Sequence, residues 1–350
     1  MQPPSPLRDI LLKLCRREDL TRSEARDAFS HIMSGHATEA QIGGLLIGLA
    51  AKGSTVDELV GAATVMREKA IPIACDASGK DDGVIIDTCG TGGDVRGTFN
   101  ISTAAAIIVA AAGVRVVKHG NRSATSKAGS ADVLEKLGVN LELNPEQLRT
   151  CLDSANICFA FARYHHPAMK FVGAARTSLG VPTIFNLLGP LTNPARARHQ
   201  LLGVFSPELT DRLASVLREL GSTRAWVVHA EDGLDELSTL GPTRISELRD
   251  GEVHTWHLDP KDVGIPYARL PDLRVNNVDE AAEALRRVLA GDEGPMREIS
   301  LLNAAAALVV AEQEKDLTAA IARAASAIDS GRAQQTLNAL IASSQRAKPA

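Results

Sequence analysis

The chain has 350 residues, of which 45% are hydrophobic, 23% charged and 3% aromatic, and its formal net charge is -4. This is the composition of an ordinary globular protein, and the length suggests about two domains. The few aromatic residues argue against a base-stacking surface for single-stranded nucleic acid. The slightly acidic balance gives no general attraction to polyanions, so any phosphate site must be local.

The N-terminal residues lack the basic and apolar regions of a secretory signal. The longest nearly apolar stretch, 103–117, is interrupted by Gly113 and Arg115 and is too short to cross a bilayer. We therefore expect a cytoplasmic protein. Five cysteines without a paired CxxC arrangement indicate reduced thiols rather than disulfides or a zinc site. Among them Cys89, inside a glycine motif, is expected to be a small filler rather than a nucleophile.

Helical periodicity runs from about residue 6 to residue 69, and Thr21 and Thr55 offer N-caps within it. We expect a small all-helical domain over residues 1–75, joined by added helices from about 165–190. Packing or dimerisation is its expected role.

From Val84 onward, short β-rich runs alternate with amphipathic helical segments. Strands are expected at 84–86, 114–117, 157–162, 201–205 and 225–229, and helices at 101–112, 131–137, 145–155, 207–220, 278–289 and 299–311. This alternation predicts an α/β domain over 76–345 with a central, mainly parallel sheet, and an active site at the carboxyl ends of its strands. The segment 251–276 has no clear period, and 317–346 is Ala-rich and helical.

A glycine-rich loop, DTCGTGGD at 87–94, follows the first expected strand and leads into a helix that Thr98, Asn100 or Ser102 can cap. Its glycines allow main-chain N–H groups to converge, and the helix start adds a positive dipole end, so an anion site is expected. The dinucleotide fingerprint fails because Val95 stands where glycine is required, and the Walker pattern fails because Thr98 and Phe99 replace its Lys-Ser/Thr pair.

Two further loops follow later strands. The loop 118–126, KHGNRSATS, is dense in cations, hydroxyls and an amide, and in a parallel sheet it should face the glycine loop. Two such polar loops in one crevice favour a ligand site. After the strand 225–229 come Asp235 and Glu236, whose hard oxygen donors suggest Mg²⁺ if they lie beside a polyphosphate.

Together these motifs resemble the anthranilate phosphoribosyltransferase family. They are GTGGD at 90–94, NIST at 100–103, KHGNR at 118–122, GSAD at 129–132, TIFNLLGPLTNP at 183–194 and GLDE at 233–236, in the family's order. The likeness extends from the helical start to about residue 320. It implies a nucleoside phosphorylase/phosphoribosyltransferase-like fold and transfer of the phosphoribosyl group of 5-phosphoribosyl-1-pyrophosphate to the amine of anthranilate, in tryptophan biosynthesis. It also implies Mg²⁺, two ions per active site, and a homodimer joined through the helical domain, with no nucleic-acid or membrane partner.

The resemblance, carried over residue by residue, implies catalytic roles for Lys118, His119 and Asn121. Phosphoribosyl pyrophosphate is expected to contact Gly90, Gly93, Asp94, Thr98, Asn100, Ile101, Ser102, Thr103, Lys118, His119, Gly120, Asn121, Arg122, Ser123, Ala124, Thr125, Ser126 and Ser130. Anthranilate is expected to contact Gly90, Asn121 and Arg176, with His119 and the Pro167 region near its entry path. The expected metal ligands are Ser102, Asp235 and Glu236.

The residue chemistry agrees with these implied roles. Departing pyrophosphate gathers negative charge, which main-chain amides, Lys118 and Mg²⁺ can stabilise, and positioning of the amine supplies much of the rest. Arg176 can pair with the anthranilate carboxylate through its planar guanidinium. His119 could act as a general base, although a main-chain hydrogen bond is the favoured interpretation. The adjacent His165 and His166 are not expected to share a metal ion.

One position departs from the family pattern. Pro182 stands where family members commonly carry arginine, and it removes a cation and a main-chain donor. The details of the anthranilate tunnel or of the hinge, and the choice of acceptor, are therefore left open by the sequence. The nearest rival enzyme is a pyrimidine nucleoside phosphorylase, which resembles the family in fold but needs no Mg²⁺. A nucleic-acid-binding relative of the fold is the other alternative, and it expects a basic surface that the acidic balance opposes.

Overall fold

The structure is a computed structural model that describes residues 7–75, 83–94, 96–122 and 128–346. In chain order its helices and strands, with short 3-10 helices marked η, are α1 (Leu7–Cys15), α2 (Arg22–Met33), α3 (Glu39–Lys52), α4 (Val56–Lys69), β1 (Ile85–Gly90), α5 (Ile101–Ala111), β2 (Arg115–Gly120), α6 (Ser130–Lys136), α7 (Pro145–Ala155), β3 (Ile157–Phe161), α8 (Ala162–His165), η1 (Pro167–Met169), α9 (Lys170–Leu179), α10 (Ile184–Leu188), η2 (Pro190–Thr192), β4 (His199–Gly203), α11 (Leu209–Glu219), β5 (Arg224–Ala230), β6 (Thr243–Arg249), β7 (Glu252–Leu258), η3 (Pro260–Val263), η4 (Leu270–Leu273), α12 (Val278–Ala290), α13 (Pro295–Val310), α14 (Leu317–Asp329) and α15 (Arg332–Arg346).

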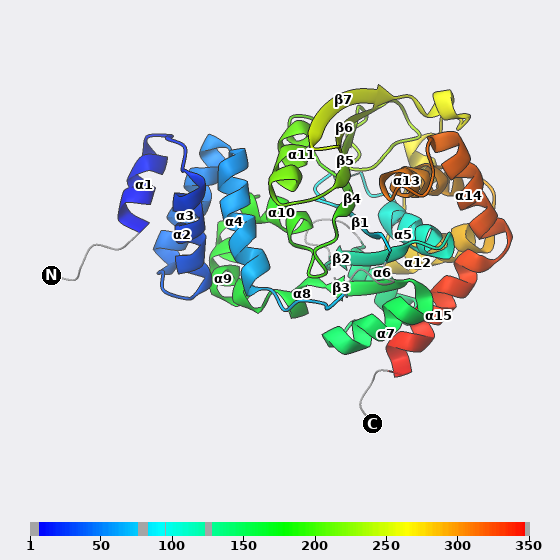
Figure 1. Cartoon of the computed structure of the whole chain (residues 1–350), viewed down its shortest axis with the longest axis horizontal. Coiled ribbons are helices and arrows are strands. Elements are labelled where there is room, and N and C mark those ends of the chain that lie inside the picture. The colour runs from blue at the N-terminus through cyan, green and yellow to red at the C-terminus, as the bar shows by residue number, and fades with distance from the viewer. Residues whose placement is uncertain (1–6, 76–82, 95, 123–127, 347–350) are drawn as a thin grey trace.

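The N-terminal helices begin where the sequence places threonine caps. Thr21, Thr38 and Thr55 each accept a hydrogen bond from the main chain three residues on, and the side chain at that position returns it, which forms a capping box. Helices α1–α4 lie at one end of the molecule, with α9 and α10 against them (Figure 1). Close contact of α2 with α4 requires Gly61, because a Cβ there would lie 2.5 Å from the Arg22 main-chain oxygen.

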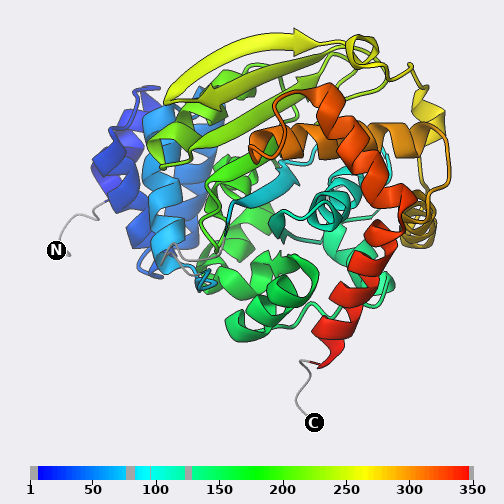
Figure 2. The same ribbon diagram turned by 45° about the vertical axis from the view of Figure 1, so that its right-hand side comes forward.

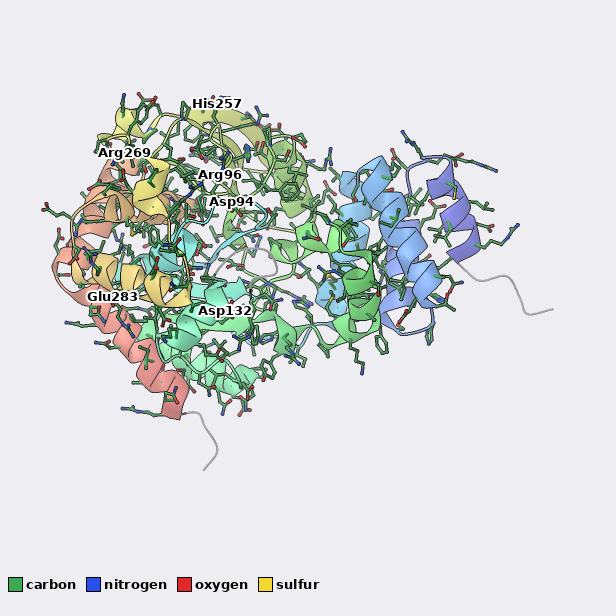
Figure 3. All side chains as sticks on the ribbon, turned by 180° about the vertical axis from the view of Figure 1, so that it is seen from behind. Asp94, Arg96, Asp132, His257, Arg269 and Glu283 are labelled. Atoms are coloured by element: carbon green, nitrogen blue, oxygen red, sulfur yellow. The ribbon has the colours of Figure 1, made fainter. Side chains whose placement is uncertain are left out.

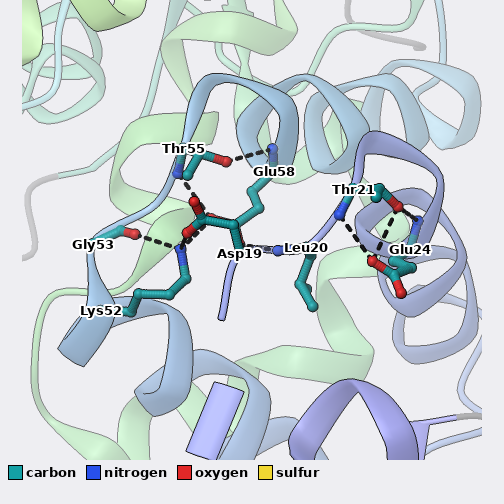
Figure 4. Close-up of polar contacts among 8 residues, drawn as sticks. All are labelled: Asp19, Leu20, Thr21, Glu24, Lys52, Gly53, Thr55 and Glu58. Atoms are coloured by element: carbon teal, nitrogen blue, oxygen red, sulfur yellow. Dashed lines mark hydrogen bonds and ion pairs between the residues drawn. The ribbon is translucent and has the colours of Figure 1, made fainter. Parts of the chain in front are cut away.

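A buried carboxylate ties α3 and α4 to the segment that precedes α2. Glu58, at the start of α4, is fully buried, and it accepts hydrogen bonds from the main-chain N–H of Leu20 (2.8 Å) and Thr55 (2.8 Å) and from Lys52 Nζ (2.9 Å) (Figure 4). Lys52 also donates to Asp19 (2.7 Å). Because its oxygens are all engaged, this charge is held without an unpaired polar group.

The larger part is built on a sheet of seven described strands in the order β3-β2-β1-β4-β5-β6-β7. The first five strands pair in parallel, and β6 pairs antiparallel with both β5 and β7. This confirms the predicted fold class, a helical domain plus an α/β domain with a mainly parallel sheet. Helices α5 and α13 contact one face of the sheet and α11 contacts the other (Figures 1 and 2).

The β6–β7 hairpin is the element that the sequence analysis missed. Strand β7 lies at the edge of the sheet and most of its residues are exposed, so it carries none of the apolar alternation by which a half-buried strand is recognised. The strand expected at 201–205 also lies two residues earlier, at β4.

The described apolar residues form two contiguous cores. One lies between the sheet and helices α5, α7 and α12–α15. The other begins inside the helical bundle, where the Phe29 and Phe185 rings meet edge to face at 5.7 Å, and continues through α11 to Leu202 and Val227 on the sheet. The bundle is therefore packed onto the sheet by a shared core. Among the described helices, none is both long and apolar enough to cross a membrane.

Candidate active site

The three polar loops singled out in the sequence meet in one crevice of about 420 Å³ at the carboxyl ends of β1, β2 and β4. The predicted site residues that line it are Gly90, Gly93, Asp94, Thr98, Asn100, Ile101, Ser102, Lys118, His119, Gly120, Asn121, Arg122, Ser130, Asp235 and Glu236. A second cavity of about 440 Å³, near Arg67 and Arg196, has no comparable loops. We therefore take the crevice as the candidate active site.

The glycines of the first loop make room for Asp235. Gly90 and Gly203 stand opposite each other on β1 and β4. A Cβ at Gly203 would lie 1.5 Å from the main-chain oxygen of Asp235, and one at Gly90 would lie 2.5 Å from its Oδ2. The Asp235 carboxylate in turn accepts a hydrogen bond from Gly92 N (2.9 Å). Gly92 and Gly93 have φ angles of 64° and 92°, which residues other than glycine rarely adopt.

The far end of the glycine loop is held by residues much later in the chain. Thr98 forms a single antiparallel bridge with Arg274. On either side, Phe99 N donates to Leu273 O (3.0 Å) and Val275 N donates to Gly97 O (3.0 Å). Asp94 lies beside Arg96 (Figure 3), whose main-chain N–H it accepts at 3.3 Å. The loop is thus fixed at both ends.

Helix α5 begins without the side-chain cap that the sequence suggested. Asn100 occupies the N-cap position but makes no capping bond, and its Nδ2 donates to Ala128 O (3.1 Å) in the neighbouring loop. The expectation of a cap by Asn100 is therefore wrong. Instead, Glu236 Oε1 accepts a hydrogen bond from Ser102 N (3.1 Å). A carboxylate at the helix N-terminus is electrostatically favoured.

The crevice brings acidic side chains close together. Burial, and then the charge of Asp94, raises the pKa of Asp235 to about 7. Burial, and then the charge of Asp235, raises the pKa of Glu236 to about 8. Within the described ranges, no three acidic, histidine or cysteine side chains form a metal site by themselves. Mg²⁺ commonly uses only one or two carboxylates and completes its shell with substrate oxygens and water, so these oxygen donors fit that ion.

The Lys118 ammonium lies at the floor of the crevice and its side chain is buried. Its Nζ donates to Thr88 O (2.5 Å) and to Ser102 Oγ (3.3 Å). Burial lowers the pKa of Lys118, while the negative charge of Asp87 opposes that change. A positive charge is thus fixed beneath the glycine loop.

His119 is bonded within the protein. Its Nδ1 lies 3.1 Å from Gly189 O and its Nε2 lies 3.2 Å from His166 Nε2. Burial, and then the neighbouring His166, keeps the pKa of His119 well below its ordinary value. His165 points elsewhere, because its Nδ1 lies 2.8 Å from Ile71 O. The main-chain contact favoured from the sequence is therefore present, at a neutral imidazole.

Some predicted site residues do not face the crevice. Thr103 is buried in α5, and the Arg176 guanidinium lies over the Phe185 ring, 5.2 Å from its centroid. The Arg122 guanidinium bonds Asp132 (2.7 Å) on α6, although the residue borders the crevice. The predicted Ser123, Ala124, Thr125 and Ser126 lie outside the described residues.

Several lining residues were absent from the predicted set. They are Cys89, Thr91, Gly92, Gly97, Phe99, Ala128, Gly129, Pro182, Asn186 and Phe205. Phe205 lies two residues after the end of β4, so the rule that parallel strands end at the active site would have indicated it. The Cys89 thiol accepts a hydrogen bond from Gln200 Nε2 (3.1 Å), and burial raises its pKa well above the ordinary value, which is the environment of an unreactive thiol.

Comparisons with known proteins cover nearly the whole chain. Residues 8–70 match the helical bundle domain of a glycosyl transferase family, and residues 82–334 match the a/b domain of that family. The chain is 49% identical over 333 residues to an anthranilate phosphoribosyltransferase of Parvibaculum lavamentivorans, covering 95% of this chain and 96% of the relative. It is 50% identical over 336 residues to one of Rhodospirillum rubrum, covering 96% and 95%.

Two solved structures are similar over nearly the full length. The anthranilate phosphoribosyltransferase of Thermus thermophilus superposes with a TM-score of 0.88 at 40% identity, covering 96% of this chain and 99% of that one. The enzyme of Saccharomyces cerevisiae in complex with PRPP and Mg superposes with a TM-score of 0.89 at 27% identity, covering 98% and 99%.

Proposed function

The chain belongs to the anthranilate phosphoribosyltransferase family, as its motifs suggested, and we propose that it transfers the 5-phosphoribosyl group of 5-phosphoribosyl-1-pyrophosphate to the amine of anthranilate. The products are N-(5-phosphoribosyl)anthranilate and pyrophosphate, and the reaction belongs to tryptophan biosynthesis. The observation that carries this proposal is the convergence of the glycine loop, the Lys118–Arg122 loop and the Asp235–Glu236 pair on one crevice.

We propose that the glycine loop and the start of α5 bind the diphosphate of the substrate. Main-chain N–H groups of the loop and the positive end of the helix dipole favour an anion there. Lys118 supplies a fixed positive charge beneath this position, held by Thr88 O and Ser102 Oγ. Charge that gathers on pyrophosphate as it departs meets donors already in place, so little reorganisation is needed.

Ser102, Asp235 and Glu236 are the residues proposed to hold Mg²⁺, with two ions per active site. The raised pKa values of Asp235 and Glu236 support this role, because a bound cation would favour the charged carboxylates that burial, and then their mutual repulsion, disfavour. When bound, Mg²⁺ offsets the charge of the diphosphate. A similar enzyme, that of Saccharomyces cerevisiae, has been solved with PRPP and Mg.

Anthranilate is proposed to contact Gly90, Asn121 and Arg176. Gly90 and Asn121 line the crevice. Arg176 lies on α9 and stacks on Phe185, so its guanidinium would have to leave that ring to pair with the carboxylate of anthranilate. Because its pKa lies well below the ordinary value, His119 would be a weak general base for the amine proton. Positioning of the amine against the ribose carbon is proposed to supply most of the catalysis.

We further propose a division into a helical domain, residues 1–75 with the helices from about 165 to 190, and a phosphoribosyl pyrophosphate-binding domain, residues 76–345. The protein is proposed to be cytoplasmic and homodimeric through the helical domain. Two exposed apolar side chains on contacting helices support that surface, namely Leu12 on α1 and Ile47 on α3, which are 42% and 40% exposed.

The test is a fluorescence assay with anthranilate, phosphoribosyl pyrophosphate and Mg²⁺. Anthranilate fluorescence should fall with enzyme and stay constant when Mg²⁺ is chelated. Turnover that persists without Mg²⁺ would favour the phosphorylase alternative. If pure folded protein leaves anthranilate unchanged but consumes another acceptor, the assignment of anthranilate is wrong.

A further inference from the structure

Strands β1 and β2 stop pairing just before the active site. Their ladder contains only Ile85 with Arg115 and Ile86 with Val116. On the other sides of the same strands, pairing with β4 and β3 continues to Gly90 and Gly120. The gap therefore belongs to this one pair of strands, which carries the glycine loop and the Lys118–Arg122 loop.

The register shows which main-chain bonds are replaced. Continued by two residues, it would set Thr88 opposite Lys118. In a parallel ladder, the main-chain groups of Thr88 would then bond the two residues that flank Lys118, namely Val117 and His119. His119 N–H, Val117 C=O and Thr88 C=O would all be used in that rung.

In the structure, three side chains form hydrogen bonds with these main-chain groups instead. His119 N donates to Asp87 Oδ1 (3.1 Å). Asn193 Nδ2 donates to Val117 O (2.8 Å). Lys118 Nζ donates to Thr88 O (2.5 Å). Each of these hydrogen bonds places a side chain where a main-chain partner would otherwise stand between β1 and β2. The two strands therefore diverge without leaving these buried main-chain groups unpaired.

The inserted groups also bond one another. Asp87 is fully buried and Asn193 is 4% exposed. Asn193 Nδ2 donates to Asp87 Oδ2 (2.8 Å), and Asn193 Oδ1 accepts from Ala195 N (2.9 Å). Asp87 also gives the buried Lys118 ammonium a nearby negative charge. A network in which every member is satisfied is rigid.

We propose that Asp87 and Asn193 are positioning residues for the transfer reaction, which hold β1 and β2 apart and so fix Lys118 and His119 at the crevice. Neither residue lines the crevice itself; both act through the two that do. Asp87 orients the His119 main chain, and the divergence lets the Lys118 side chain cross to β1 and reach Ser102 Oγ (3.3 Å). This inference rests on the proposed function.

The test compares Asp87→Asn with a matched control, Glu58→Gln. Glu58 is also fully buried, also accepts main-chain N–H groups and also lies beside a lysine, but it belongs to the helical bundle (Figure 4). Both variants remove a buried carboxylate charge, so both should lower the urea midpoint. Asn193→Ser provides a second probe of the same network if Asp87→Asn folds poorly.

Asp87→Asn should lower kcat by about a hundredfold, because misplacing a charge near the reacting groups by about 1 Å has that effect. The KM for anthranilate should change by less than about threefold, since neither residue meets that substrate. Asn193→Ser should lower kcat in the same way, and Glu58→Gln should leave it within about twofold of the wild type.

Folded Asp87→Asn with a kcat within about threefold of the wild type would overturn the inference, as would an equal kcat loss in Glu58→Gln. Calorimetric binding of phosphoribosyl pyrophosphate with Mg²⁺, without anthranilate, separates this test from the proposed function. If the wild type binds that ligand but does not consume anthranilate, the proposed acceptor is wrong. The inference then stands only if Asp87→Asn weakens the binding and Glu58→Gln does not.

Discussion

Replacement of Gly203 by alanine should displace the carboxylate pair of the active site. The new Cβ would lie 1.5 Å from the Asp235 main-chain oxygen, whereas real Cβ atoms keep at least 3.0 Å from such a neighbour. The Asp235 segment must therefore retreat by about 1.5 Å, since a main-chain carbonyl cannot rotate away as a side chain can. That movement would break the bonds from Gly92 N to Asp235 and from Ser102 N to Glu236.

Displacement of this size should lower kcat/KM for phosphoribosyl pyrophosphate by about a hundredfold or more, which is about 2.7 kcal/mol of transition-state stabilisation. The assay is the loss of anthranilate fluorescence over a range of Mg²⁺ concentrations, and the variant should need more Mg²⁺ for half-maximal rate. Gly241→Ala is the matched control, because a Cβ there meets no atom within 4 Å. A folded Gly203→Ala enzyme with kcat/KM within about threefold of the wild type would show that the Asp235 segment can move without loss of turnover.

Three other predictions concern the metal site, pH and the bundle. Asp235→Asn combined with Glu236→Gln should cut turnover at limiting Mg²⁺ with little change in the thermal midpoint, and an unchanged rate would contradict their role as ligands. Because burial raises the Glu236 pKa from 4.5 to about 8, the folded metal-free protein holds this proton more tightly than the unfolded chain does. The contribution of Glu236 to stability is thus fully present below pH 4.5, and the free energy of unfolding in urea should fall as the pH rises toward about 8. Glu236→Gln should flatten this pH profile. Identical slopes in the variant and the wild type would count against a raised Glu236 pKa. Gly61→Ala would set a Cβ 2.5 Å from Arg22 O and should destabilise the fold by about 1–3 kcal/mol with kcat unchanged, whereas an unaltered melting temperature would show that α2 and α4 can separate freely.

The parts of the site that could be predicted from the sequence are those encoded locally. Glycines after a strand, a helix start and a cation-rich loop each occupy a few consecutive residues. The parallel-sheet rule then brings the loops after β1 and β2 to one edge. Lys118 and Glu236 were expected in one crevice, and both line it.

The parts that could not be predicted depend on partners far apart in the chain. Nothing near Gly203 reveals that the Asp235 carbonyl will lie against it. Asn100 was expected to cap α5, but its side-chain nitrogen bonds Ala128, 28 residues later, and its side-chain oxygen makes no capping bond. Strand β7 escaped notice because an exposed edge strand needs no apolar face. A pattern of neighbouring residues does not show which contacts a residue will make with parts of the chain that are distant in sequence.

Because Thr98 pairs with Arg274, the glycine loop of a nascent chain can reach its native contacts only after the later segment has been synthesised. Arg274 Nε bonds the Arg96 carbonyl across 178 residues, so at ribosomal speeds of roughly 5–20 residues per second the glycine loop waits roughly 10–35 s for this partner. Until then its open main chain has only solvent or chaperones to bond. A polypeptide that ends just before residue 273 would contain all seven described strands, but the glycine loop would lack the partners that hold its far end.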